Sequence, residues 1–316
     1  MGKLAFVFPG QGAQVVGMSK EFYNSYPECK EVFDIAEQEL DFDIKKLCFE
    51  ENEDINKTEY TQAAILTAST CILKAIQKKG IQADYVAGLS LGEFSALVAN
   101  ETLSFADAVK VVRKRGIYME TEVPAGKGTM AAVLGVDTEK IEEICKGVAE
   151  ETGMPVEPAN YNCPGQTVIS GETKSVVLAK QRLEEAGAKK VVLLNVSGPF
   201  HSAMLEGVEE KLHEEFQNVD FKEGTIPYVS SVNAEVVAAD EDRAVVKKLL
   251  EKQVHVSVRW QQAVETMIKE GVDTFVEIGP GKTLSGFIKR ICRGVKIINI
   301  NKVSDLDKLD ELVAEC

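Results

Sequence analysis

The chain has 316 residues, of which 45% are hydrophobic and 27% charged, a composition typical of a globular protein larger than one ordinary domain. Its formal net charge of -14 at pH 7 argues against nucleic acid as a partner and requires any acidic partner to bind at a local basic surface. No apolar run approaches the roughly 18 residues of a membrane-spanning helix, and the apolar stretch at 3–8 is too short for a secretory signal. We therefore expect a cytoplasmic protein.

The first 125 residues alternate strands and helices, a pattern that favours a parallel sheet covered by helices. The expected elements are a strand at 4–8, helices at 28–40 and 61–79, a strand at 83–87 and a helix at 93–99. A capping box at 104–107 then predicts the start of a further helix, which runs through residue 119.

The pattern changes at the break 124–128 and predicts a second, smaller unit. The expected elements are a strand at 129–136, a helix at 138–151, strands at 156–160 and 166–170, a helix at 175–186 and a strand at 189–196. This βαββαβ order is the ferredoxin-like plan, and it ends at a second break, 197–199.

After this break the strand and helix alternation of the first segment resumes. The expected elements are a strand at 227–232, helices at 242–251 and 260–270, a strand at 274–278, a helix containing 284–288 and a strand at 295–300, before an acidic tail. We therefore expect a large α/β-hydrolase-like domain with a parallel sheet, formed by 1–125 and 197–316, and an inserted ferredoxin-like domain at 126–196. The cleft between them is the expected site.

The cysteines and histidines predict reduced thiols and no metal site. The cysteines are scattered, seven in number and never spaced as C-x-x-C, which is typical of buried thiols in an intracellular protein. They are Cys29, Cys48, Cys71, Cys145, Cys163, Cys292 and Cys316. The three histidines, His201, His213 and His255, neither pair at helical spacing nor lie beside a cysteine, so zinc is not expected.

The segment 88–92, Gly-Leu-Ser-Leu-Gly, lies between an expected strand and an expected helix. A G-x-S-x-G in that setting predicts a nucleophile elbow, in which the glycines let the backbone crowd and the hydroxyl of Ser90 stands exposed. The N-terminus of the following helix would face any negative charge that develops at this serine. An ordinary tight turn is the alternative interpretation.

A serine nucleophile needs a base, and His201 is the best candidate because it lies where the inserted domain rejoins the large one. Position alone leaves a structural role equally open. His213 lies in a charged helical run and is expected at the surface, whereas His255 lies among valines and is expected in the core or at an edge. No acid stands out as the third member of a Ser-His-Asp triad, because an acid such as Glu277 is typical of many protein surfaces. We therefore expect a backbone carbonyl or an amide side chain to orient His201.

The segment 279–283, Gly-Pro-Gly-Lys-Thr, imitates a phosphate-binding loop. The motif would require glycine at position 276, where the chain has Val276, and Pro280 removes a backbone donor that such a loop needs. We interpret the segment as a structural turn.

Six motifs, in register and in order, resemble those of the malonyl-CoA:acyl carrier protein transacylases, relatives of the acyltransferase domains of fatty-acid and polyketide synthases. They occupy 8–14, 88–93, 115–119, 162–166, 200–202 and 277–281. The resemblance covers nearly the whole chain. The family often has histidine where this chain has Leu89, and more often proline where Ser257 stands.

The resemblance implies a role for each matching residue. It makes Ser90 the nucleophile and His201 its base, with the backbone N–H groups of Gln11 and Leu91 as the oxyanion hole. It further implies a substrate-binding set of Arg115, Gln253, Asn162 and Phe200. In that set Arg115 holds the malonyl carboxylate, and Gln253 orients His201 through its main-chain carbonyl. The alternatives are a solvated basic trio for Arg115 with its neighbours Arg113 and Lys114, and a mere tight turn at Gln11.

The resemblance implies transfer of a malonyl group from malonyl-CoA to the phosphopantetheine thiol of acyl carrier protein, through a malonyl-serine, in fatty-acid biosynthesis. It implies no metal and no bound cofactor, since the CoA thioester and the thiol are substrates. The alternatives are a serine thioesterase or hydrolase, an acyltransferase of a polyketide pathway, or a scaffold subunit without activity.

Carrier proteins of this pathway are acidic, so their docking on a chain of net charge -14 needs a local basic surface. The candidates are Lys289, Arg290 and Arg293, with Lys189 and Lys190 at the edge of the inserted domain. Ordinary solvated charges are the alternative.

Overall fold

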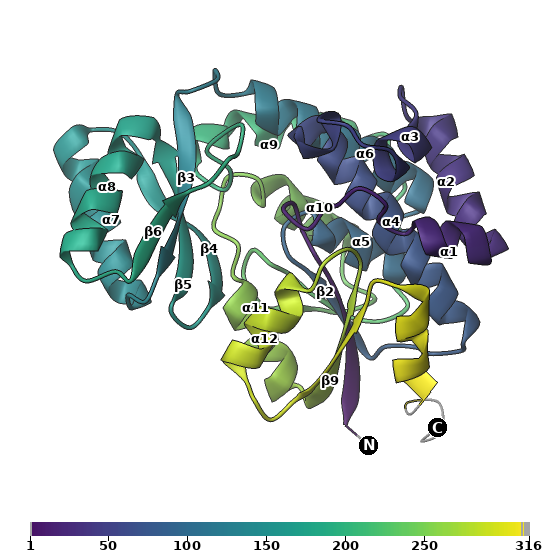
Figure 1. The fold of residues 1–316 in the computed structure, drawn as a ribbon. Coiled ribbons are helices and arrows are strands. Elements are labelled where there is room, and N and C mark those ends of the chain that lie inside the picture. The colour runs from purple at the N-terminus through teal and green to yellow at the C-terminus, as the bar shows by residue number, and fades with distance from the viewer. Residues whose placement is uncertain (1, 311, 313–316) are drawn as a thin grey trace.

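The computed structural model describes residues 2–310 and 312 and contains two separate β-sheets (Figure 1). The larger sheet has six strands in the order β10-β9-β1-β2-β7-β8. These strands are β1 (Lys3–Phe8), β2 (Tyr85–Gly88), β7 (Tyr228–Val229), β8 (Val236–Val237), β9 (Val272–Ile278) and β10 (Lys296–Ile300). All its pairs are parallel, as expected, except the short antiparallel pair of β7 and β8 at one edge.

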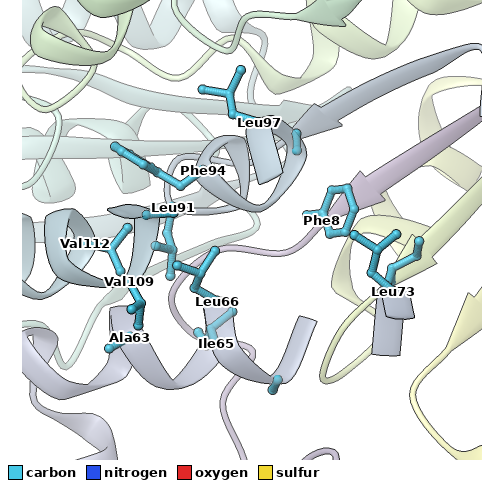
Figure 2. Close-up of a cluster of buried hydrophobic side chains, with 14 of the residues drawn as sticks. Phe8, Ala63, Ile65, Leu66, Leu73, Leu91, Phe94, Leu97, Val109 and Val112 are labelled. Carbon is cyan, nitrogen blue, oxygen red and sulfur yellow. The ribbon is translucent and has the colours of Figure 1, made fainter. Parts of the chain in front are cut away.

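Helices cover both faces of the large sheet, and β1 shows why. Its alternate residues enter different cores, because successive side chains of a strand point to opposite faces: Phe6 and Phe8 into one, Ala5 and Val7 into the other. The first core is closed by α2 (Pro27–Glu39), α4 (Thr58–Lys78), α5 (Gly92–Ala99), α6 (Phe105–Thr121), α9 (Gly207–Phe216) and α10 (Arg243–Lys252). Figure 2 shows side chains of β1, α4, α5 and α6 meeting in it. The second core is closed by α11 (Trp260–Lys269) and α12 (Thr283–Ile291).

The smaller sheet has four antiparallel strands in the order β4-β5-β3-β6. They are β3 (Gly128–Leu134), β4 (Val156–Cys163), β5 (Gln166–Glu172) and β6 (Lys190–Leu193). Two helices, α7 (Thr138–Thr152) and α8 (Thr173–Glu185), pack on the face turned away from the large sheet (Figure 1). The opposite face contributes Met130 and Val168 to the first core of the large unit.

A short segment after α10 attaches the small sheet to the large unit. The backbone N–H of Val258 donates to the carbonyl of Ala159 at 2.8 Å, and the N–H of Tyr161 donates to the carbonyl of Val258 at 2.8 Å. Ser257 adds a hydrogen bond from its hydroxyl to the carbonyl of Pro158 at 2.6 Å. This segment also carries Gln253, so the joint between the sheets lies close to the candidate site.

Most expected elements are present, with three kinds of difference. The helices α1 (Lys20–Ser25) and α3 (Ile44–Phe49), the strand β8 and three 3-10 turns, Asp54–Asn56, Ala203–Leu205 and Val303–Leu309, were not predicted. The strand β7 is shorter than the predicted 227–232. The strand β6 ends at Leu193 instead of 196, and Leu194 and Val196, beyond its end, line a cavity.

The described cysteines match the expectation of reduced thiols: five are buried and Cys292 is partly buried, all without a disulfide. Cys316 lies outside the described residues. Among the helices of residues 2–310 and 312, none combines the length and apolar character needed to cross a bilayer.

Candidate active site

Ser90 occupies a sharp turn between β2 and α5, as the motif predicts, with a left-handed φ of 52°. The glycines on either side make the turn possible. A Cβ on Gly92 would lie 2.1 Å from the carbonyl oxygen of Phe8, and one on Gly88 would lie 1.8 Å from the carbonyl carbon of Gly92. Because these neighbours are backbone atoms that cannot rotate away, no larger residue fits at position 88 or 92. The tight turn places the Ser90 side chain at the carboxyl end of β2.

His201 lies against this serine. The Oγ of Ser90 and the Nε2 of His201 are 2.8 Å apart, and the Nδ1 of His201 lies 2.8 Å from the backbone carbonyl oxygen of Gln253. The backbone N–H of His201 donates to the carbonyl of Val254 at 3.1 Å, so the 253–254 segment fixes both its backbone and its ring. Within residues 2–310 and 312, no carboxylate hydrogen-bonds to His201.

The protonation state of His201 follows from its surroundings. Burial, reinforced by the positive charge of Arg115, lowers the pKa of His201 from 6.5 to about 3. The imidazole is therefore neutral at physiological pH, and a carbonyl at Nδ1 requires the proton on that nitrogen, which leaves Nε2 free to accept one from Ser90.

Arg115, on α6, is only 1% exposed and reaches the same hydroxyl. Its Nη2 donates to the Oγ of Ser90 at 3.2 Å and to the Oε1 of Gln253 at 2.9 Å, while its Nη1 donates to the Oε1 of Gln62 at 2.6 Å. All these acceptors are neutral. In the described chain no carboxylate lies within ion-pair distance of Arg115, so a buried guanidinium faces the site without a direct counter-ion.

The alternative of a solvated basic trio is wrong for Arg115. Lys114 is exposed, and Arg113 pairs with Asp41 at 3.0 Å and Glu59 at 2.7 Å, whereas Arg115 points into the protein. Burial lowers the pKa of Arg115 to about 9.

A cavity of ≈ 220 Å³ opens beside these groups, and both sheets line it. The large unit contributes Pro9, Gly10, Gln11, Gly12, Ala13, Leu89, Ser90, Leu91, Arg115, Met119, Thr283, Leu284 and Phe287, and the small sheet contributes Met130, Asn160, Asn162 and Val168. The remaining lining residues, Leu194, Val196, Phe200 and His201, belong to the segment that leaves the small sheet. The predicted candidates Asn162 and Phe200 therefore lie in the wall with Ser90.

The two residues expected to supply backbone donors, Gln11 and Leu91, line the same cavity. The loop after β1 packs directly on the elbow, because a Cβ on Gly10 would lie 2.4 Å from the carbonyl oxygen of Leu89, and this contact brings Gln11 next to the serine. Leu91 follows Ser90 at the start of α5. Among the hydrogen bonds of residues 2–310 and 312, none uses the backbone N–H of Gln11 or of Leu91.

Comparison with known proteins identifies the family. The model of the acyl transferase domain matches residues 5–303. The malonyl CoA-acyl carrier protein transacylase of Bacillus subtilis (strain 168) is 46% identical over 302 residues, which are 95% of this chain and 94% of that protein. The chain belongs to the acyl transferase family.

Solved structures of the same family have the same α/β fold. The malonyl CoA-acyl carrier protein transacylase from Clostridium perfringens superposes with a TM-score of 0.93 at 42% identity, covering 99% of this chain and 98% of that one. A malonyl-transacylase solved in complex with a type II PKS acyl-carrier protein superposes with a TM-score of 0.94 at 36% identity, covering 98% and 99%.

One buried acid of this acyl transferase was missed by the sequence reasoning. Glu93, on the first turn of α5, is fully buried, and its Oε2 accepts hydrogen bonds from the backbone and hydroxyl of Ser231, at 3.1 and 2.6 Å, and from the Nε2 of Gln253 at 2.8 Å. An acid in an apolar run, three residues after the serine, is the signal that could have revealed it.

Glu277 was interpreted as a surface acid, and that interpretation is wrong. It is fully buried and accepts from the backbone N–H groups of Leu284 and Ser285, at 3.0 and 2.8 Å, at the start of α12. A carboxylate thus occupies the helix N-terminus where a phosphate loop would hold its ligand, while Gly279 and Gly281 adopt φ values of 141° and 78°. The structural turn predicted for this segment is therefore confirmed.

The other two histidines lie outside the cavity. His213 is exposed and lies 2.8 Å from Glu251, as expected for a surface residue, and His255 is partly buried with its Nε2 2.5 Å from the Oε2 of Glu209.

The five basic residues considered for carrier binding are all exposed. Lys289 and Arg290 lie on α12, Arg293 follows it, and Lys189 and Lys190 lie at the start of β6. Arg290 is not a freely solvated charge, because its Nη1 donates to the Oε1 of Gln166 at 2.9 Å and so ties α12 to the small sheet.

Proposed function

We propose that this chain transfers a malonyl group from malonyl-CoA to the phosphopantetheine thiol of an acyl carrier protein, in fatty-acid biosynthesis, through a malonyl ester on Ser90. One observation carries the proposal. The Ser90 hydroxyl touches a neutral His201 at 2.8 Å and a buried Arg115 at 3.2 Å, so a base and a carboxylate-binding group meet at one reacting atom.

In the first half-reaction, Nε2 of His201 takes the proton of Ser90 as the Oγ attacks the thioester carbon. The backbone N–H groups of Gln11 and Leu91 stabilise the oxyanion. The carbon–sulfur bond then breaks, and CoA leaves with the proton from His201. Gln253 acts as a positioning residue, because its carbonyl holds Nδ1–H of the imidazole.

In the second half-reaction, the carrier thiol gives its proton to His201 and its sulfur attacks the serine ester. The Ser90 oxygen leaves and recovers the proton from His201, which restores the free enzyme. The proposed chemistry uses no metal and no bound cofactor, since both CoA thioester and phosphopantetheine thiol are substrates.

The proposed acyl selectivity rests on Arg115. A guanidinium binds a planar carboxylate with two parallel hydrogen bonds, which a lysine cannot do. The neutral partners of Arg115 leave its charge available to the malonyl carboxylate. Phe200 and Asn162 shape the remaining wall around the acyl group.

We further propose that the chain divides into a discontinuous α/β-hydrolase-like catalytic domain, 1–125 and 197–316, and an inserted ferredoxin-like domain, 126–196. The βαββαβ element order and the strand order β4-β5-β3-β6 support the second part. We keep the cytoplasm as the proposed location, on the evidence of the scattered cysteines.

The proposed carrier surface comprises Lys289, Arg290, Arg293, Lys189 and Lys190. Strand register supports their grouping, because Lys190 pairs with Leu134 and Leu134 with Gln166, the residue that Arg290 binds. At about 4.8 Å between neighbouring strands, Lys190 lies about 10 Å from Gln166. The helix face that carries Phe287 into the cavity continues one turn later at Arg290.

Intact-protein mass spectrometry tests the proposed function. Incubation with malonyl-CoA should add one malonyl group, on the peptide containing Ser90, and phosphopantetheinylated carrier protein should remove it. The Ser90→Ala variant should form no adduct and should keep less than about a thousandth of the transfer rate. Faster residual transfer would contradict the nucleophile assignment, and rapid loss of the adduct to water without carrier would favour the hydrolase alternative.

A further inference from the structure

Glu93 is a buried acid with no place in the chemistry above. It lies three residues after the nucleophile, has no exposed surface and directs only one oxygen at its partners. Burial raises the pKa of the Glu93 carboxyl, and hydrogen bonds from Ser231 and Gln253 oppose that rise. Its Oε1 has no hydrogen-bond partner among the described residues, but the three donors at Oε2 and the buried cation of Arg115 favour the ionised form.

Arg115 is the matching buried cation. Its Nε is also buried and without a partner in the described chain, and its two other nitrogens contact only neutral groups. A buried charge is costly unless an opposite charge is near, and the negative charge of Glu93 acts on Arg115 to oppose the fall of its pKa.

The side chain of Gln253 connects the two charges. Its Oε1 accepts from Arg115 at 2.9 Å, and its Nε2 donates to Glu93 at 2.8 Å. This orientation places the negative end of the amide dipole at the cation and the positive end at the anion. Rotating the amide by half a turn would set oxygen against carboxylate and N–H against guanidinium, so both charges favour one orientation.

We propose that Glu93 is the resident counter-ion of Arg115, acting through the amide of Gln253, and that it limits how tightly the site holds a carboxylated acyl group. This inference rests on the proposed function. A direct ion pair would occupy the guanidinium and exclude the malonyl carboxylate. An anion one amide away compensates the buried cation without itself occupying a guanidinium donor, and it opposes a second anion weakly enough for the malonyl group to move on to the carrier.

The Glu93→Gln variant tests this, because it removes the charge and keeps an oxygen for the three donors. The KM for malonyl-CoA should fall about tenfold, the size expected for two negative charges about 12 Å apart, on either side of Gln253 and Arg115, at an effective dielectric of about 20. The KM for acetyl-CoA, which carries no carboxylate, should change less than about twofold. The thermal midpoint of the free variant should fall, and malonate should raise it by more than it raises that of the unmodified protein.

Ser231→Ala is the matched control. It removes the hydroxyl's hydrogen bond to Glu93 and the one it accepts from Gln253 at 3.3 Å but keeps both charges, so the ratio of the two KM values should stay unchanged. Equal changes in both KM values for Glu93→Gln, or a rise for malonyl-CoA alone, would overturn the proposal. A Glu93→Gln variant that stays unfolded in saturating malonate would also overturn it, because the malonate anion should replace the missing negative charge near Arg115. Failure of the unmodified protein to form the malonyl adduct would instead refute the proposed function.

Discussion

At the scale of single residues, the site is governed by burial. His201 and Arg115 lie almost out of water within contact of the same hydroxyl, and the charge of Arg115 helps to lower the pKa of His201. Burial, reinforced by this cation, keeps the imidazole neutral, and a neutral imidazole leaves the cation free to bind an anion. Base and carboxylate-binding group are therefore maintained by one electrostatic arrangement.

Replacing Arg115 by alanine should change acyl preference more than chemistry. Malonyl transfer should fall by orders of magnitude, since a desolvated charge-assisted contact is worth about 2–5 kcal/mol. Acetyl transfer should be spared or improved. Rates of both donors, measured beside Lys114→Ala as a control at an exposed neighbour on α6, check this. Equal losses for the two donors would make Arg115 structural.

The lowered pKa of His201 predicts a pH-dependent stability. In the unfolded chain the ring gains a proton near pH 6.5, whereas in the folded chain it does so only near pH 3. The contribution of the neutral His201 ring to the free energy of unfolding is thus complete above pH 6.5 and is lost as the pH falls toward 3. At pH 5 the unfolded form gains about 2 kcal/mol from this group.

Urea unfolding of the unmodified protein and of His201→Asn, each at pH 7.5 and pH 5, measures this difference. The variant lacks the titrating ring, so its stability should fall by about 2 kcal/mol less between the two pH values. Equal losses would show that His201 titrates normally in the folded protein.

At the scale of elements, the elbow depends on two glycines that admit the backbone of neighbouring segments. Gly92→Ala should destabilise the protein by about 1–3 kcal/mol or more, because the new methyl would overlap the carbonyl of Phe8. By contrast, a Cβ added to Gly147, inside α7, would meet no atom of the described residues within 4 Å. Gly147→Ala should therefore stabilise by up to about 1 kcal/mol. Urea midpoints that fall equally for both variants would contradict the steric argument.

The sequence was informative about elements and less so about what they bury. Periodicity located the βαββαβ unit and most of the helices, because apolar spacing reports directly on a covered face. The G-x-S-x-G motif located the turn at Ser90. Periodicity could not choose among three neighbouring basic residues on α6, since which of them faces inward depends on Gln62 and Gln253 in distant segments. Glu93 and Glu277 were missed for the same reason: their donors lie on other elements.

At the scale of the molecule, the cavity exists because two sheets are held at a fixed separation. The contacts at Val258 and the Arg290–Gln166 hydrogen bond hold them from the side of the large unit. Since Gln253 lies five residues before Val258, the joint also supports the carbonyl that orients His201. The Arg290–Gln166 contact, where the two units meet, lies within the surface on which we propose that the carrier docks.

Reversing two charges on that rim tests the carrier surface. Lys289→Glu with Arg293→Glu should raise the KM for carrier protein and leave malonyl loading of Ser90 nearly unchanged, and the effect should shrink in high salt. Arg290 is left intact because it holds the small sheet. Lys140→Glu with Lys146→Glu, on α7, makes the same charge change on the far face and should have little effect. If the Lys289→Glu, Arg293→Glu variant slows both half-reactions equally, or slows neither, the carrier protein binds at another surface.

The position of β1 has a consequence for how the chain is made. This first strand lies between β2 and β9, so its second edge stays open until residues 272–278 have been synthesised. The strands of the small sheet all lie within 128–193 and can pair while the ribosome is still translating the last third. The apolar segment Leu4–Phe8 thus waits half-paired through most of translation, and a nascent chain exposes there the edge that chaperones protect from aggregation.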